Sequence, residues 1–156
     1  MERVTDVAAA VESTVESLLA VLDAARMAQT PAVPPTQLRV LSIIEGSRHT
    51  NMSRLAEALD VVPSSASRLC DRLEATGLLR RVPDPRDRRE VRLLLTAAAT
   101  KLLEELRERR RAALAGVLER MSPANRNDLV RAMAAFAAAT AVAESDADTE
   151  TALRSA

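Results

Sequence analysis

The sequence predicts a mainly α-helical protein that carries one short β-hairpin. Alanine, the strongest helix former, is abundant, and only 3 glycines interrupt the 156 residues. Apolar residues recur at three- and four-residue steps through most of the chain, which is the spacing of one face of an α-helix. Between Leu78 and Leu95 the pattern changes to the short runs that are typical of strands. The length suits about one domain with a core of its own.

The first predicted helix covers residues 4–29. Its apolar positions form a single stripe: Val4, Val7, Ala8, Val11, Val15, Leu18, Leu19 and Leu22. Prolines within residues 31–35 end this helix. Thr36 is then the expected N-cap of a short helix over 37–45, which Gly46 ends.

Two further short helices follow, separated by a tight turn. Asn51 is the expected N-cap of the first, whose apolar positions recur as far as Leu59. Pro63 stands where a helix can begin, and the second helix is predicted over 64–76. Gly77 suits the left-handed conformation that ends many helices. The inward positions predicted for this second helix are Ala66, Leu69, Cys70 and Leu73.

Two long helices are expected at the C-terminal end. Thr96 caps the first, which continues to about Met121, and Ser122 followed by a proline starts the last, which continues to about Val142. The acidic residues 143–156 show no periodicity, so we expect them to lack regular structure.

The middle of the chain has the element order of a winged helix-turn-helix. Residues 78–82 and 90–95 are predicted strands, and the polar segment between them contains two prolines, as the tip of a hairpin would. A short helix, a turn, a second short helix and this hairpin leave the second helix free to enter a DNA major groove.

The charges favour DNA binding by this part of the chain. The 22 basic and 22 acidic residues cancel overall, but residues 1–38 have a net charge of −3 and residues 39–96 a net charge of +3. Residues 80–92 hold six arginines against three acidic residues. Local basic density governs contact with phosphates, so the hairpin is expected to lie against a nucleic acid.

The second short helix has an outer face that could read base edges. This face consists of Ser64, Ser65, Ser67, Arg68, Asp71 and Arg72. Small hydroxyl side chains permit a close approach, and Arg68 could reach a guanine or a phosphate. Taken alone, the face fits an ordinary solvated helix equally well, and the basic hairpin favours the DNA interpretation.

These segments resemble the MarR (multiple antibiotic resistance regulator) family. The resemblance rests on the run from Ser64 to Leu79, on the hairpin segment Asp84-Pro-Arg-Asp-Arg-Arg89 and on Leu93-Leu-Leu-Thr96. The family's wing pattern, D-x-R-D-x-R, stands here as Asp84, Arg86, Asp87 and Arg89. The resemblance implies a homodimeric transcriptional regulator, usually a repressor, that binds a pseudo-palindromic operator and is released by a small-molecule effector in many relatives.

The resemblance also implies roles for the wing residues. Arg86 would enter a narrow minor groove, and Asp84 would hold it there through a charge-assisted hydrogen bond. Asp87 and Arg89 would brace the wing, although Arg88 and Arg89 could also contact phosphates. The predicted DNA-binding residues are therefore Ser64, Ser65, Ser67, Arg68, Arg72, Asp84, Arg86, Arg88 and Arg89.

The expected organisation follows from these elements. Residues 1–35 form a dimerisation helix and linker, 36–96 the winged DNA-binding domain, 97–142 the C-terminal dimerisation helices and 143–156 a disordered acidic tail. The N-terminus lacks a signal peptide's cationic start, and no segment reaches the roughly 18 apolar residues of a membrane span. We therefore expect a cytoplasmic protein without a membrane partner.

Composition argues against several other classes. One cysteine, Cys70, and one histidine, His49, cannot make a structural zinc site or an intrachain disulfide, and no cofactor or metal is expected. The chain has no Gly-rich phosphate-binding loop, so an enzyme is not expected. Cys70 on an inward position is interpreted as a core residue rather than a redox switch, and His49 as a connector residue.

Two alternatives to a sequence-specific regulator stay open. A winged dimer that binds another protein would favour an apolar or acidic outer face on the second short helix. An architectural DNA-binding protein would bind an operator and random DNA with equal strength.

Overall fold

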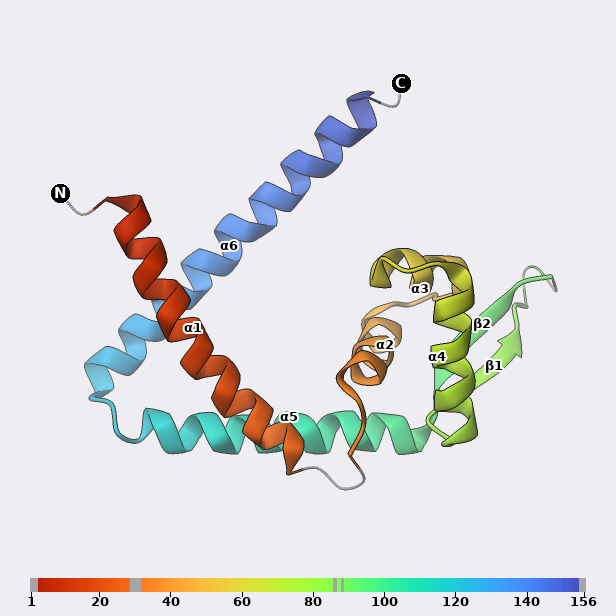
Figure 1. Ribbon diagram of the computed structural model, residues 1–156, viewed down its shortest axis with the longest axis horizontal. Helices are drawn as coiled ribbons and strands as arrows, with labels where there is room; N and C mark the ends of the chain where they lie inside the picture. The colour runs from red at the N-terminus through yellow and green to blue at the C-terminus, as the bar shows by residue number, and fades with distance from the viewer. Residues whose placement is uncertain (1–2, 29–31, 86, 88, 155–156) are drawn as a thin grey trace. The chain divides into compact units, whose positions relative to one another are not determined.

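The computed structural model contains six α-helices and two β-strands among the residues that it describes, in two compact units, Met1–Ala113 and Leu114–Ala156 (Figure 1). The described residues are 3–28, 32–85, 87 and 89–154, with side chains as far as Ala141. The predicted mainly helical fold with one antiparallel two-stranded sheet is confirmed.

The elements follow the predicted order. The helices and strands are α1 (Val4–Met27), α2 (Pro35–Gly46), α3 (Met52–Leu59), α4 (Pro63–Ala75), β1 (Leu79–Pro83), β2 (Val91–Leu95), α5 (Ala97–Leu118) and α6 (Pro123–Arg154). Apart from the two ends discussed below, most bounds fall within two or three residues of the predicted ones, because the signals that start and end these elements are local.

Three predicted N-caps are present. The side-chain oxygens of Asn51, Thr96 and Ser122 each accept a hydrogen bond from the backbone N–H three residues further on, at 2.9, 3.2 and 3.2 Å. Gly77 has a φ of +73°, the left-handed conformation predicted for the end of α4.

The start of α2 was predicted wrongly. Thr36 lies inside the helix, which begins at Pro35, and Pro34 occupies the cap position without a side-chain cap bond. A proline at the first helical position has a backbone φ suited to the helix, and its missing N–H would have had no partner inside the helix. Two adjacent prolines therefore start this helix two residues earlier than a threonine cap at position 36 would.

The end of α6 also differs from the prediction. The helix continues to Arg154, through the acidic segment for which we expected no regular structure. Alanine and glutamate favour helix, and after Pro123 the sequence contains neither glycine nor proline to end it.

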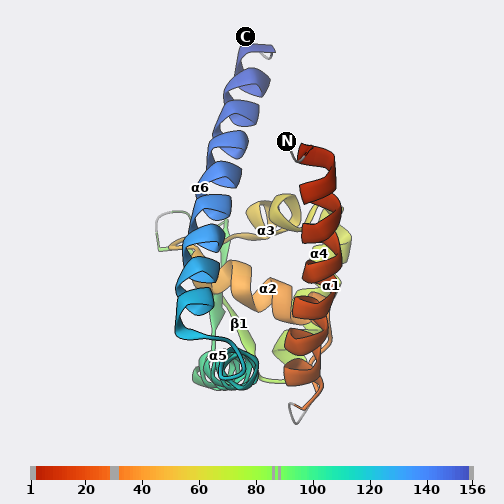
Figure 2. The same cartoon turned by 90° about the vertical axis from the view of Figure 1, so that its left-hand side faces the viewer.

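An aliphatic core lies between α2, α3, α4, the hairpin and the first half of α5 (Figures 1 and 2). Its largest fully buried side chains are Val40, Leu41, Leu55, Cys70, Leu73 and Leu93. The chain has no tryptophan or tyrosine, so closely packed aliphatic side chains supply most of this core's stability.

The hairpin is joined to the segment before α3. β1 pairs antiparallel with β2, from Leu79 opposite Leu95 to Pro83 opposite Val91. The Leu93 N–H donates to the carbonyl of Thr50 at 3.0 Å, which extends the sheet by one bridge. This bridge fixes the base of the wing beside the start of α3.

The helices α1 and α6 carry large apolar side chains on their surfaces. Among the described residues of α1 one side chain, Ala25, is buried. The exposed large hydrophobic residues of these two helices are Val4, Val7, Val11, Val15, Leu19, Met27, Leu129, Val130, Met133 and Phe136. No helix in the described part of the chain is apolar over a stretch long enough to cross a bilayer.

Candidate nucleic-acid interface

Helix α4 presents two chemically different faces. Ala66, Cys70 and Leu73 are buried in the core, and Leu69 packs against its edge. On the other side Ser64, Arg68 and Arg72 are exposed, while Ser65 and Ser67 are half-buried. The predicted inward positions therefore lie as expected. Of the predicted outer face, Ser64, Arg68 and Arg72 are exposed, whereas Asp71 is paired with Arg81 of the hairpin.

The thiol of Cys70 belongs to the inward face. Burial raises its pKa to about 11; the nearby charge of Arg81 lowers it, and the carboxylates of Asp71 and Glu74 raise it further. A thiol with such a pKa stays protonated near neutrality and is a poor nucleophile. The placement agrees with the interpretation of Cys70 as a core residue.

The base of the wing is built around Asp84, which is 5% exposed. Its backbone N–H donates to the carbonyl of Glu90 at 2.9 Å, which closes the loop at the end of the hairpin. Its carboxylate lies 3.4 Å from Nε2 of His49 and 3.9 Å from Nε of Arg92. A buried carboxylate beside such groups holds the hairpin against the segment before α3.

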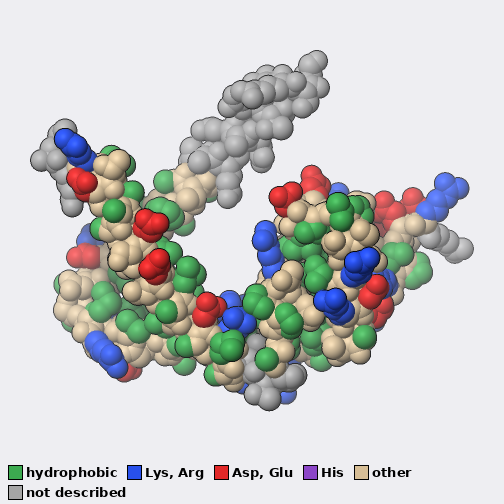
Figure 3. Space-filling view, in the orientation of Figure 1, with side chains coloured by type: hydrophobic (Ala, Val, Ile, Leu, Met, Phe, Trp, Pro, Cys, Tyr) green, Lys and Arg blue, Asp and Glu red, His purple; other side chains and the backbone are tan. Residues whose placement is uncertain are grey.

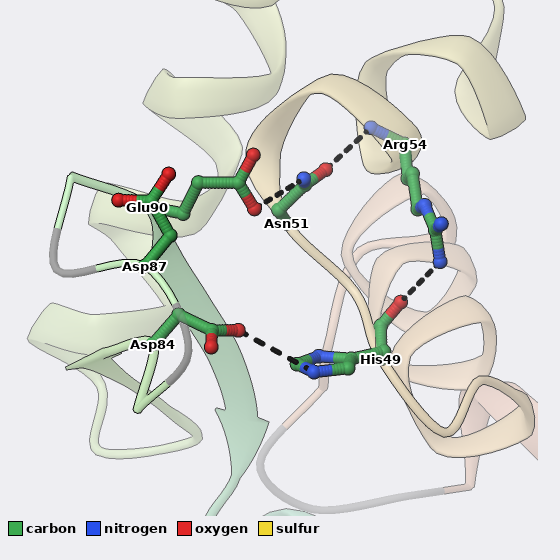
Figure 4. Close-up of a pocket in the computed structure, with 6 residues that line it drawn as sticks. All are labelled: His49, Asn51, Arg54, Asp84, Asp87 and Glu90. Atoms are coloured by element: carbon green, nitrogen blue, oxygen red, sulfur yellow. Dashed lines mark hydrogen bonds and ion pairs between the residues drawn. The ribbon is translucent and has the colours of Figure 1, made fainter.

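His49 was therefore interpreted too narrowly from the sequence. It lies in the connector, as predicted, but its ring reaches the carboxylate of Asp84 in the wing (Figure 4). Its own carbonyl accepts a hydrogen bond from Nη1 of Arg54 at 3.3 Å, so the connector is tied both to the wing and to α3.

A polar pocket of about 240 Å³ opens at this junction. His49, Asn51 and Arg54 line one side, and Asp84, Asp87 and Glu90 line the other (Figure 4). Nδ2 of Asn51 donates to Oε2 of Glu90 at 3.1 Å, so the N-cap of α3 also binds the hairpin. Among the described residues, no group of three or more His, Cys, Asp or Glu side chains is arranged as metal ligands.

The tip of the hairpin holds the key wing residues of the prediction. Arg86 and Arg88 lie outside the described residues. Arg89 is exposed, and its backbone N–H donates to Oδ1 of Asp87 at 2.9 Å. This bond across two residues is a local turn, which fits the bracing role considered for Asp87.

The basic charge of residues 80–92 is smaller than a count of arginines indicates. Nη1 of Arg81 lies 2.7 Å from Oδ1 of Asp71 and 2.8 Å from Oε2 of Glu74, so its charge is compensated by α4. Arg92 lies near Asp84 at the base of the wing. Figure 3 accordingly shows acidic side chains among the basic ones over α4 and the hairpin.

The contacts of Arg81 also extend along α4. Its Nη2 donates to the carbonyl of Ser67 at 3.3 Å, and its backbone N–H donates to Oε1 of Glu74 at 3.3 Å. Partial burial lowers the pKa of the guanidinium, but the hydrogen bonds and charges of Asp71 and then Glu74 outweigh it, and the pKa is raised. In the sequence Arg81 is one of six arginines within residues 80–92, and no local signal distinguishes it from the other five.

Comparisons with a family model, with curated sequences and with solved structures all match this chain to transcriptional regulators or to proteins of the same fold. A family model described as MarR family matches residues 33–90. The HTH-type transcriptional repressor MdtR of Bacillus subtilis (strain 168) is 35% identical over 86 residues, which are 55% of this chain and 56% of MdtR. The chain thus spans little more than half the length of the curated relatives that it matches.

Two solved structures extend the likeness beyond the winged domain. RV1404 from Mycobacterium tuberculosis is 32% identical with a TM-score of 0.78, over 90% of this chain and 96% of that one. A mutant of MepR from S. aureus, solved bound to an oligodeoxyribonucleotide, is 16% identical with a TM-score of 0.66, over 85% of this chain and 96% of that one. The second likeness is one of fold.

Proposed function

The chain belongs to the MarR family, and from this premise we propose that it is a sequence-specific DNA-binding transcriptional repressor. It binds a pseudo-palindromic operator as a homodimer, with α4 in the major groove and the tip of the hairpin in the minor groove. The observation that carries the proposal is the outer face of α4, where exposed hydroxyl and guanidinium groups stand beside a hairpin anchored at Asp84.

Base readout is assigned to the outer face of α4. Ser64, Arg68 and Arg72 are exposed there, and the small side chains of Ser65 and Ser67 leave room for the edge of a base pair. This chemistry differs from the apolar or acidic face that a protein-binding winged helix would favour. The MepR complex with an oligodeoxyribonucleotide is a DNA complex of a protein with the same fold.

The minor-groove contact is assigned to Arg86, with Arg88 and Arg89 near the phosphates. Support comes from the base of the wing, because Asp84 is buried and hydrogen-bonded two residues before Arg86. A tip carried on a fixed base loses less conformational freedom when it enters a groove.

The homodimer is supported by the apolar stripes of the long helices. On α1 the exposed residues Val4, Val7, Val11 and Val15 recur at three- and four-residue steps, which places them on one side of the helix. An exposed apolar stripe of this length is typical of an interface between subunits. The small-molecule effector implied by the family resemblance stays a prediction.

The proposal is tested by comparing two DNA duplexes. The first is selected from a random-sequence library with the full chain, and the second is a scrambled duplex of the same composition. Arg68→Ala should reduce the preference for the selected duplex by about 5-fold or more, as expected for a lost base contact. Lys101→Ala, which removes a charge from α5, is the matched control and should leave the preference unchanged.

The outcomes separate the alternatives. Equal affinity of the unmodified protein for both duplexes would favour the architectural DNA-binding protein. Failure to bind either duplex would overturn the proposal and favour a protein-binding module.

The wing is tested separately by substitution at its tip. Arg86→Ala should weaken binding to the selected duplex at least about 10-fold, and Arg86→Lys should restore little, because an ammonium group lacks the planar fork and is strongly hydrated. Asp84→Ala should also weaken binding, although it removes a negative charge near DNA. This variant also deprives His49 and Arg92 of their carboxylate, so the two Arg86 variants are the sharper probe.

If Asp84→Ala strengthened binding, the wing would act as a diffuse positive patch. Circular dichroism and sedimentation of each variant check that helicity and the oligomeric state are retained.

A further inference from the structure

Arg81 contacts α4 at three points along two helical turns. The acceptors are the carbonyl of Ser67 and the carboxylates of Asp71 and Glu74, which follow one another at steps of four and three residues. Residues at this spacing lie on one side of a helix. The side of α4 that faces β1 is therefore bound by a single guanidinium group.

The other end of Arg81 is fixed by the sheet. Arg81 pairs with Leu93 in the register of β1 and β2, and Leu93 is buried in the core. A planar guanidinium with several donors fixes the direction as well as the distance of its partners. Because these contacts lie at both ends of a two-turn segment of α4, they oppose sliding of α4 along the hairpin. They also oppose rotation of α4 about its own axis.

The contacts of Arg81 reach the part of α4 that is proposed to read bases. Arg81 binds the backbone of Ser67, directly beside Arg68. Hydrogen bonds to base edges weaken steeply with distance and angle, so a small displacement of this turn changes which base is preferred.

Arg81 has little free charge for a direct phosphate contact. Its side chain is 25% exposed, and two carboxylates face one guanidinium group. Arg80, the preceding residue in β1, is exposed. Among the described residues its guanidinium has no hydrogen bond or ion pair, so it provides a matched comparison.

We propose that Arg81 is a positioning residue that holds α4 against the wing in the orientation required for base readout. The inference rests on the proposed function, because it concerns how that DNA interface is held together. It assigns to Arg81 a role in sequence preference without contact with DNA.

The test measures the ratio of affinities for the selected and scrambled duplexes. A variant that is partly unfolded binds both duplexes more weakly by the same factor, so the ratio does not respond to lost stability alone. Arg81→Gln should lower the ratio about 10-fold, the size of a lost base contact. Arg80→Gln should lower both affinities alike and leave the ratio within about 2-fold.

Two further variants test the mechanism. Arg81→Lys keeps the charge but not the fork, and should lower the ratio nearly as much as Arg81→Gln. Ser67→Ala alone should lower the ratio. Combined with Arg81→Gln it should lower the ratio little further, because the two residues act on the same turn of α4.

Three results would overturn the inference. An unchanged ratio in Arg81→Gln would leave the DNA-binding proposal standing and remove the role of Arg81. A fall of both affinities together, with a salt dependence reduced by about one phosphate contact, would make Arg81 a direct phosphate ligand. No preference in the unmodified protein would overturn the proposed function, and this inference with it.

Discussion

The winged region and the long helices α1 and α6 differ in where they place their apolar side chains. The core formed by residues 33–106 buries leucines from α2, α3, α4, β2 and α5 within one chain. On α1 and on the described part of α6, the large apolar side chains are mostly exposed, as Phe136 is at 61%. The winged region therefore buries its apolar side chains within one chain, whereas α1 and α6 leave theirs exposed to water.

The difference is what the proposed homodimer would produce, because a second copy would cover the exposed apolar stripe of α1. Helix formation by itself contributes little, so long helices are usually stabilised by packing of an apolar face. The helices of the winged region pack their apolar faces into its core. Among the described residues of α1, only Ala25 near the C-terminal end of the helix is buried. We therefore expect substitutions in the two regions to have different effects, one on folding and the other on assembly.

The largest expected effect is a core truncation in α4. Leu73→Ala removes a fully buried side chain and should lower the free energy of unfolding by about 2–5 kcal/mol. Val62→Ala, at a residue just before α4 that is 62% exposed, is the control and should change it by less than about 0.5 kcal/mol. Urea unfolding followed by circular dichroism measures both, and a small loss for Leu73→Ala would contradict a self-sufficient winged core.

The next effect concerns assembly. Val11→Asp places a charge on the apolar stripe of α1 and should raise the dissociation constant of the dimer on the order of 100-fold, about 2.7 kcal/mol. Ser13→Asp adds the same charge about 200° further round the helix and should have little effect. Sedimentation over a range of concentrations measures the constant.

A stable, folded monomer of the unmodified protein at micromolar concentration would remove the basis of this prediction. It would also show that the exposed stripes of α1 and α6 need no partner.

The smallest expected effect is a pH dependence that belongs to the winged core. Burial raises the pKa of Cys70 from 9.0 to about 11, so at pH values between these two the folded protein binds more protons than the unfolded chain. Stability should therefore fall as the pH rises through this window, by up to about 2 kcal/mol. In Cys70→Ala the free energy of unfolding should lack this part of its pH dependence. Urea unfolding between about pH 8 and pH 10.5 measures it in both proteins.

Identical slopes in the two proteins would contradict the assignment. Peroxide should leave DNA binding unchanged in both, and release of the unmodified protein alone would show that Cys70 is a redox switch after all.

Local signals predicted most of the fold. Asn51, Thr96 and Ser122 each cap a helix by accepting a hydrogen bond from the backbone N–H three residues further on, so both partners lie within one short stretch of sequence. Gly77 ends α4 because a positive φ is unstrained for glycine. Pro35 and Thr36 are both signals for the start of a helix. The residues alone did not show which of the two would start α2.

The candidate interface was predictable in its surface chemistry but not in its internal contacts. The periodicity of α4 separates Cys70 and Leu73 from Ser64 and Arg68 without any knowledge of the fold. The sequence by itself therefore determined the order of elements, the helix caps and the two faces of α4.

The tertiary structure decided which charges remain free to meet DNA. Arg81 is compensated by Asp71 and Glu74, and the carboxylate of Asp84 lies against His49, a residue far from it in the sequence. Counting charges treats every side chain as solvated, whereas a guanidinium or carboxylate changes its role once the fold brings an opposite charge within hydrogen-bonding distance. Such pairing depends on how β1 lies against α4 and how the wing lies against α3, and only packing of the whole domain fixes these arrangements.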